Sequence, residues 1–183
     1  MENNQNKTLQ KTDDTLTENE LRFKALFENS KDALMTLEPP SWKFTLGNPA
    51  TLKMFMAKDE KEFSSVEPWK LSPERQEDGS FSIDKAKKMI NIALRDGSIF
   101  FEWIHQRLNG EIFPATVLLT RISWGGKTFI QATVRDITKQ KKQEKELNEK
   151  ILELEKFNKM MVDREIRMAE LKKEIEELKE KKA

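Results

Sequence analysis

The sequence predicts an α+β domain with a five-stranded antiparallel sheet and flanking short helices, followed by one long helix. Two short apolar runs stand early in the domain, and three longer alternating runs separated by turn residues stand late in it. Helical patterns lie between these two groups, and from Thr138 onward the chain has neither glycine nor proline. Two strands, several helices and then three strands are typical of an α+β domain.

Composition favours a modest core with polar flanks. Charged residues make up 36% of the 183 residues and apolar residues 37%, and most of the aromatic residues stand between Phe23 and Phe129. We therefore expect a flexible or helical lead-in over 1–16, a compact domain over 17–137, and a coiled-coil helix over 138–183.

Charge and cysteine content argue against several classes of function. The 33 basic residues balance the 32 acidic ones, so we expect no nucleic-acid partner, and the basic run Lys139–Lys145 is better explained as a solvated helix face. The absence of cysteine excludes thiolate metal sites and flavin chemistry through a cysteinyl adduct. No apolar run approaches the roughly 20 residues that span a bilayer, so we expect no membrane insertion and a cytoplasmic protein.

A helix and a hairpin open the predicted domain. Thr17 and Glu20 have the spacing of a capping box, which predicts a helix that begins at Thr17 and ends near Asn29. An apolar stripe at seven-residue intervals would also let a helix reach back to Leu9. Two apolar runs joined by a proline-rich loop then predict a pair of strands, Ala33–Leu37 and Trp42–Leu46, which Gly47 ends.

Helical patterns fill the middle of the domain. Asn48 is placed to cap a short helix that has Pro49 at its first position. Residues 57–80 read as a loop with small helical turns. Ser82 is then placed to cap a longer helix, and the pair Asp96-Gly97 is a suitable end for it.

The last three strands give the clearest pattern. Asn109-Gly110 is the favoured two-residue hairpin turn, and it predicts one strand ending at Leu108 and another beginning at Glu111. A second turn over Trp124–Lys127 leads into the third strand. The middle strand is apolar on both sides, which indicates a second layer over the outer face and leaves its facing open. One side carries Ala115, Val117 and Leu119, and the other carries Leu118, Thr120 and Ile122.

The C-terminal helix carries an apolar seam. About 45 helical residues would extend roughly 65–70 Å, and the exposed seam requires a partner helix. A parallel homodimer is the simplest partner, although an antiparallel pair stays open. Between Leu154 and Leu171 the seam changes frame as a stammer does. The core positions that we expect are Leu147, Ile151, Leu154, Asn158, Met161, Met168, Leu171, Ile175 and Leu178.

From about Glu20 to Thr138 the sequence resembles a PAS domain of the kind found in bacterial and archaeal sensor histidine kinases. The order and spacing of several short motifs carry the resemblance. They are Glu20–Ser30 before the first strand, Asn48-Pro49-Ala50, Leu71–Gln76 with Asp78-Gly79, Phe101–His105, Asn109–Pro114, and Asp136-Ile137-Thr138 at the end of the last strand.

The resemblance implies that small helices fold over one face of the sheet to enclose a pocket. It also implies a non-catalytic sensory or dimerisation role, with Asp136, Ile137 and Thr138 relaying the signal to the coil. Homodimerisation would use the coil together with the sheet or the N-terminal helix, and a kinase or effector domain would act downstream. The pocket candidates are Phe44, Asn48, Leu52, Phe55, Met89, Phe101, Trp103, His105 and Val117.

No kinase ATP-binding region or phosphoacceptor motif follows the domain. The chain would therefore be a fragment of a larger receptor or a stand-alone regulator. No nucleophile–base pair or metal cluster is apparent, so we expect no enzyme activity of its own.

The bound molecule is left open by the sequence. His105, the sole histidine, is expected to have a structural or pocket-polar role, since haem-binding relatives carry their ligand on the helix before the third strand. Flavin held without an adduct could stack on Trp42 or Trp103, but aromatic residues in strands are more often core. The alternative is a ligand-free structural dimerisation module, and a haem- or flavin-binding sensor is a remote one.

Three arginines stand in or beside the last strands. Arg107, Arg121 and Arg135 could contact an anionic ligand. Their presence there is better explained by ion pairs with Glu102 and Asp136, or by exposure to solvent at an edge of the sheet.

Overall fold

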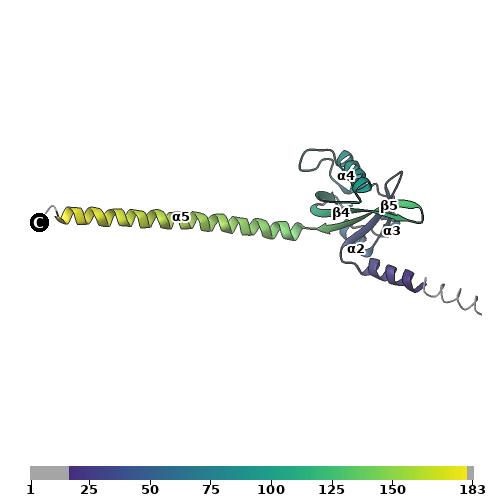
Figure 1. The fold of residues 1–183 in the computed structure, drawn as a ribbon, viewed down its shortest axis with the longest axis horizontal. Helices are drawn as coiled ribbons and strands as arrows, with labels where there is room; N and C mark the ends of the chain where they lie inside the picture. Colours follow the sequence, from purple (N-terminus) through teal and green to yellow (C-terminus); the bar gives the residue numbers. More distant parts are fainter. Residues whose placement is uncertain (1–16, 181–183) are drawn as a thin grey trace, which may run out of the picture. The chain divides into compact units, whose positions relative to one another are not determined.

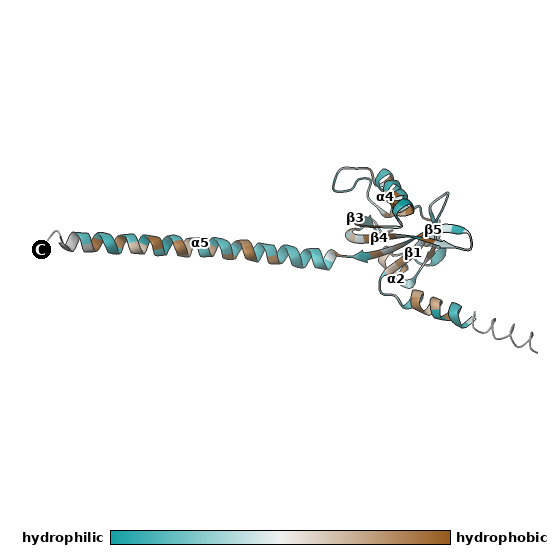
Figure 2. Cartoon of the chain, viewed as in Figure 1, coloured by the Kyte–Doolittle hydropathy of each residue, from teal (hydrophilic) through white to brown (hydrophobic). Residues whose placement is uncertain are grey.

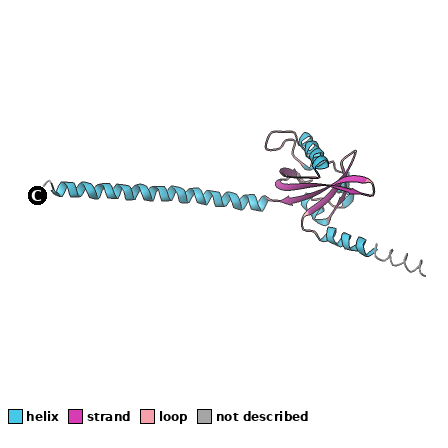
Figure 3. Ribbon diagram, viewed as in Figure 1, coloured by secondary structure: helices cyan, strands magenta, loops and turns pink. Residues whose placement is uncertain are grey.

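The computed structural model describes residues 17–180, without the side chains of 176 and 178–180, and confirms the predicted fold class. Five strands form one antiparallel sheet in the order β2-β1-β5-β4-β3 (Figure 1 and Figure 3). The strands are β1 (Ala33–Glu38), β2 (Lys43–Gly47), β3 (Ser98–Gln106), β4 (Ile112–Trp124) and β5 (Lys127–Asp136).

Short helices connect the two groups of strands. They are α2 (Pro49–Phe55), α3 (Glu60–Ser65), the 3-10 helix η1 (Pro68–Leu71) and α4 (Ser82–Asp96). A further helix, 17–29, precedes β1, and α5 (Thr138–Glu180) follows β5.

The facing of the last strands, which the sequence left open, follows from β4. Val117 and Leu119 are buried, whereas Leu118 between them is 37% exposed. The buried side chains of β1 and β5 alternate in the same way and meet core residues of α2, α3, η1 and α4. All these helices therefore contribute to a single core on the inner face of the sheet. Its helical members are Phe55, Phe63, Leu71, Ile90 and Ala93.

The turn between β3 and β4 differs from the predicted two-residue turn. The Arg107 N–H donates to the Glu111 carbonyl, and the Gly110 N–H donates to the Arg107 carbonyl. The loop therefore holds three residues, with Gly110 at a φ of 91°, which is the usual place for glycine in such hairpins. The second turn is as predicted, because Trp124 pairs with Lys127 across Gly125-Gly126.

Another local prediction is wrong. Ser82 does not cap α4, since the N-cap residue is Phe81, and the buried Ser82 hydroxyl instead donates to the Pro73 carbonyl. Gly47 ends β2 as predicted, but it does so as a paired residue of the strand. A Cβ at Gly47 would lie 3.0 Å from the Phe63 ring, so the absence of a side chain allows α3 to approach the strand.

The predicted covering layer on the outer face is incomplete among the described domain residues. Phe100 on β3 is 66% exposed, and Leu118 on β4 is also exposed. The helix 17–29 leaves apolar side chains in solvent as well. These are Leu21, Phe23 and Leu26. Leu9 and the lead-in over 1–16 lie outside the described residues.

The chain divides into two units that meet between Thr138 and Lys139. α5 is one uninterrupted helix, so the predicted change of frame does not break it. Figure 2 shows apolar residues recurring along this helix among hydrophilic ones. Among residues 17–180, no helix is long and apolar enough to cross a membrane.

Asn48 joins four segments of the domain through its fully buried side chain. Its Oδ1 accepts from the Leu34 and Thr51 backbone N–H groups at 3.0 and 2.9 Å. Its Nδ2 donates to the carbonyls of Phe27 and Asp32 at 3.1 and 3.0 Å. The predicted cap of α2 thus also ties the helix 17–29 to β1.

Replacing Asn48 with alanine should lower the free energy of unfolding by about 2–4 kcal/mol, because several buried polar groups lose their partner. Urea unfolding monitored by circular dichroism measures this. Asn91→Ala, at an exposed position of α4, is the matched control and should change stability by less than about 0.5 kcal/mol. Equal effects of the two substitutions would contradict the structural role of Asn48.

Candidate functional site

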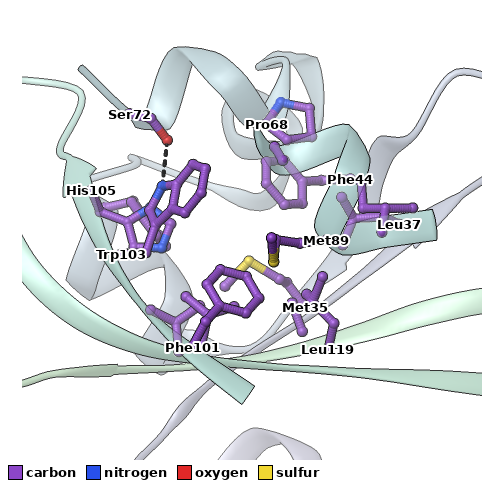
Figure 4. A pocket seen from close by; sticks show the side chains of 16 residues that line it. Met35, Leu37, Phe44, Pro68, Ser72, Met89, Phe101, Trp103, His105 and Leu119 are labelled. Carbon is purple, nitrogen blue, oxygen red and sulfur yellow. Dashed lines mark hydrogen bonds between the residues drawn. The ribbon is translucent and has the colours of Figure 1, made fainter. Parts of the chain in front are cut away.

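A cavity of about 70 Å³ lies between the inner face of the sheet and the helices (Figure 4). Seven of the nine predicted pocket residues line it: Phe44, Phe55, Met89, Phe101, Trp103, His105 and Val117. Asn48 and Leu52 do not. Asn48 is used as the cap of α2, and Leu52 packs against the rim of the core.

Nine further residues line the cavity that were not among the predicted ones. Most of them stand at alternate positions of β1, β4 and β5, and the alternation could have identified them had the facing been known. Pro68 and Ser72 belong to a region that was read as loop, where no periodic pattern was available. The missed residues are Met35, Leu37, Pro68, Ser72, Ala86, Ile90, Leu119, Ala132 and Val134.

Two polar side chains stand in this mainly apolar wall. The Trp103 indole N–H donates to the Ser72 hydroxyl at 2.9 Å, as Figure 4 shows. His105 Nδ1 lies 2.9 Å from the Leu71 carbonyl. A carbonyl can only accept, so Nδ1 carries the proton and Nε2 of the neutral ring is an acceptor.

His105 Nε2 has no hydrogen-bond partner among the described residues, although the atom is buried. Three aromatic rings surround the imidazole: Phe55 at 5.2 Å, Phe113 at 5.7 Å and Trp103 at 6.4 Å between centroids. Burial in this apolar surrounding lowers the pKa of His105 to about 4, against the opposing effect of the hydrogen bond to Leu71. The ring is therefore neutral at pH 7.

Arg107 also contacts the Phe113 ring. Its guanidinium is centred 4.0 Å from that ring, and its side chain is only 13% exposed. It donates to the Met54 carbonyl at the end of α2 and pairs with Asp136 at 2.7 Å. Its Nε also lies 3.2 Å from the Glu111 carboxylate, without the geometry of a hydrogen bond.

Asp136 holds the first residue of α5. The Thr138 backbone N–H donates to the Asp136 carboxylate at 2.8 Å. The neighbouring Ile137 is buried, and its N–H donates to the Pro114 carbonyl. Burial tends to raise the pKa of Asp136, but the hydrogen bonds from Thr138 and Arg107 outweigh it and lower the pKa.

The other two arginines are exposed, which agrees with the alternative of exposure at an edge. Arg135 forms a two-bond ion pair with Asp32 on the surface. Arg121 donates to the Leu94 carbonyl. Over residues 17–180, no three His, Asp or Glu side chains are grouped as they would be to hold a metal ion.

The His105 pKa makes stability depend on pH. The unfolded chain binds a proton near pH 6.5 and the folded chain only near pH 4, so the free energy of unfolding should fall as pH drops from 6.5 towards 4. We expect a loss of about 2 kcal/mol between pH 7 and pH 5 from this group, measured by urea unfolding. His105→Phe removes the sole histidine and should remove this part of the dependence. If the variant and the original chain show the same difference between the two pH values, His105 is not held neutral.

The sequence matches no protein-family model and no curated protein. Solved structures do resemble the domain. The PAS domain of an HTR-like protein from Haloarcula marismortui has a TM-score of 0.56 and 24% identity, over 70% of this chain and 99% of its own. A PAS domain from a two-component sensor histidine kinase has a TM-score of 0.52 and 21% identity, over 66% of this chain and 98% of its own. An RNA-binding light-oxygen-voltage receptor has a TM-score of 0.55 and 16% identity, over 69% of this chain and 35% of its own.

The two PAS domains are covered almost completely by the match. The domain that ends at Asp136-Ile137-Thr138 therefore has the PAS fold.

Proposed function

We propose that this chain is a non-catalytic sensory module of a signal-transduction protein. In this proposal, a molecule in the cavity changes the contacts at the start of α5, and α5 passes the change on as half of a coiled coil. The observation that carries the proposal is a continuous series of contacts from His105, in the cavity wall, to Asp136, where α5 begins.

Each contact in the series is direct. The His105 ring stacks on Phe113 at an interplanar angle of 27°, and the Arg107 guanidinium covers Phe113. Arg107 then holds Asp136, whose carboxylate accepts from the Thr138 N–H. A ligand that displaces the His105 ring must therefore shift or loosen the group that fixes the first turn of the helix.

Arg107 is suited to such a relay because it is buried and has several partners. Besides Asp136 it contacts the end of α2, where Phe55 also meets the His105 ring. A change in the cavity can thus reach the guanidinium from β4 and from α2. Two arrangements of this ion pair, differently favoured by an occupied and an empty cavity, would make the junction a two-state element.

The proposed partner of α5 is a second copy of this chain. Leu147, Leu154 and Met161 are 58%, 62% and 42% exposed along the described helix. A partner helix would bury this seam and stabilise the long helix by packing. A parallel pair would place the two Asp136–Thr138 junctions at the same end of the coil, where they could act together. A kinase or other effector is the proposed downstream partner.

A second candidate is a ligand-free structural dimerisation module. The volume of the cavity favours it, because about 70 Å³ is far less than the roughly 300–1,000 Å³ of pockets for drug-sized ligands. The remote alternative of a haem- or flavin-binding sensor would require the cavity to expand several-fold. The sensory proposal requires only a small ligand or a partner surface.

The dimer can be tested by disulfide crosslinking, since the chain has no cysteine of its own. In a parallel coil, equivalent core residues face each other, so Leu154→Cys should crosslink to its copy in high yield under mild oxidation. Lys156→Cys, on the opposite side of the helix, is the matched control and should crosslink weakly. High yield at both positions would indicate random collision, and low yield at both would contradict the parallel dimer.

Asp136→Asn tests the relay. It removes the ion pair with Arg107 and should change the relative crosslinking yields of cysteines placed one at a time at 151, 154 and 158, while the dimer persists. Asp32→Asn removes the surface pair with Arg135, off the contact series, and should leave the yields unchanged. Loss of the exposed Asp32–Arg135 pair should cost no more than about 1 kcal/mol of stability. Loss of the Arg107–Asp136 pair should cost more, about 1–3 kcal/mol, because the largely buried Arg107 guanidinium loses its carboxylate partner. Identical yields in both variants would rule out this path.

A further inference from the structure

The cavity wall contains one hydrogen-bond acceptor that the described residues leave unused. The Ser72 hydroxyl oxygen accepts from the Trp103 indole N–H, and His105 Nδ1 donates to the Leu71 carbonyl. Among the side-chain atoms of the described cavity lining, His105 Nε2 is the one that is buried and without a hydrogen-bond partner. A buried acceptor in this condition is destabilising, and a molecule that donates to it recovers the lost interaction.

We propose that the cavity binds a small, neutral, mainly apolar molecule with one hydroxyl group, which donates a hydrogen bond to His105 Nε2. The chemical class is that of short-chain aliphatic alcohols. This specifies the ligand of the sensory function proposed above and rests on that function for its biological meaning.

The volume of the cavity limits the size of the proposed ligand. About 70 Å³ is roughly half the volume of an engineered apolar cavity of about 150 Å³ that holds benzene. A molecule of about three to five non-hydrogen atoms therefore fits without expansion of the core. Larger aromatic ligands would have to displace side chains such as Phe101 and Met89, which Figure 4 shows around the cavity.

The residues that line the cavity determine which charge and polarity the proposed ligand can have. Its residues are apolar apart from Ser72 and the neutral His105, so an ion would lose its hydration without gaining a counter-ion. A ketone or an ether offers only acceptors and would leave Nε2 unsatisfied. A primary aliphatic amine is charged at pH 7. An alcohol combines a donor with an apolar body, which is the combination that the wall complements.

The test compares 2-propanol with acetone, which have the same carbon and oxygen skeleton and differ in the hydroxyl donor. Each is titrated into the full ¹⁵N-labelled chain and followed by NMR. We expect saturable shifts at backbone amides of cavity-lining residues with 2-propanol, a change in the His105 Nε2 resonance, and binding of acetone that is about tenfold weaker.

Two variants identify the site. His105→Phe keeps an aromatic ring but lacks the acceptor, and it should bring the two affinities together. Ala86→Met fills the cavity from α4 and should abolish binding of both molecules, whereas Ala25→Met, at an exposed position of the helix 17–29, should not. The comparison of the two probes on the unchanged chain tests the proposal even if a variant does not fold.

Equal affinities for the two probes in the unchanged chain would overturn the role of the hydroxyl donor while leaving the cavity as a binding site. No saturable binding of 2-propanol, with a His105 Nε2 resonance that already reports a hydrogen bond in the free protein, would show that an internal water occupies the site and would overturn the ligand class. Neither result bears on the crosslinking of α5, so failure here is distinguishable from failure of the proposed relay.

Discussion

The register of β3 against β4 determines what the interior of this domain contains. Side chains alternate across a strand, so a shift of one residue would exchange the inner and outer sets. The three-residue loop at 108–110 places His105 opposite Phe113 and Trp103 opposite Ala115. Because of this register, the imidazole meets both the cavity and the ring beneath Arg107, and every later step of the proposed relay depends on that placement.

The same register explains where sequence reasoning stopped. The number of strands, their order along the chain, the cap of α2 and the long helix follow from local patterns, and the structure agrees with them. The pair Asn109-Gly110 predicts a two-residue turn that would pair Leu108 with Glu111. The actual loop includes Leu108, whose N–H donates to the Phe55 carbonyl in α2. This contact between distant segments overrides the local preference, and no window of sequence around the turn contains it.

The candidate site was predictable to the extent that it uses strand positions. The motif Phe101–His105 alternates, so Phe101, Trp103 and His105 fall on one face together. Asn48 was misplaced because a polar residue near the pocket can serve either the ligand or the fold, and only its partners, Phe27, Asp32 and Leu34, show that it serves the fold. Arg107 was recognised as a partner of Asp136, but its contact with Phe113 needed the structure.

Asn48, Arg107 and His105 differ in how fully their hydrogen-bonding groups are paired. Asn48 uses both its carbonyl and its amide, and it fixes one arrangement of the segments around it. Arg107 is held by several partners of unequal quality, and His105 has one nitrogen paired and one not. A fully satisfied buried group is costly to move, whereas a partly satisfied one can gain interactions by moving or by binding. The proposed relay therefore runs through the partly paired groups, His105 and Arg107, and not through Asn48.

In the proposed coiled coil, the sequence of α5 allows this adjustment to be expressed as rotation. Leu147, Leu154, Met161, Met168 and Ile175 follow each other at intervals of seven, so they fit one unbroken heptad position in the continuous helix. Ile151 and Asn158 complete a core on one side of this row, and Phe157 and Leu171 complete a different core on the other side. Since both cores share the same central row, the helices can exchange one for the other by turning about their axes, without sliding or unwinding. A small change in how Asp136 holds the first turn is therefore sufficient input for the proposed coil.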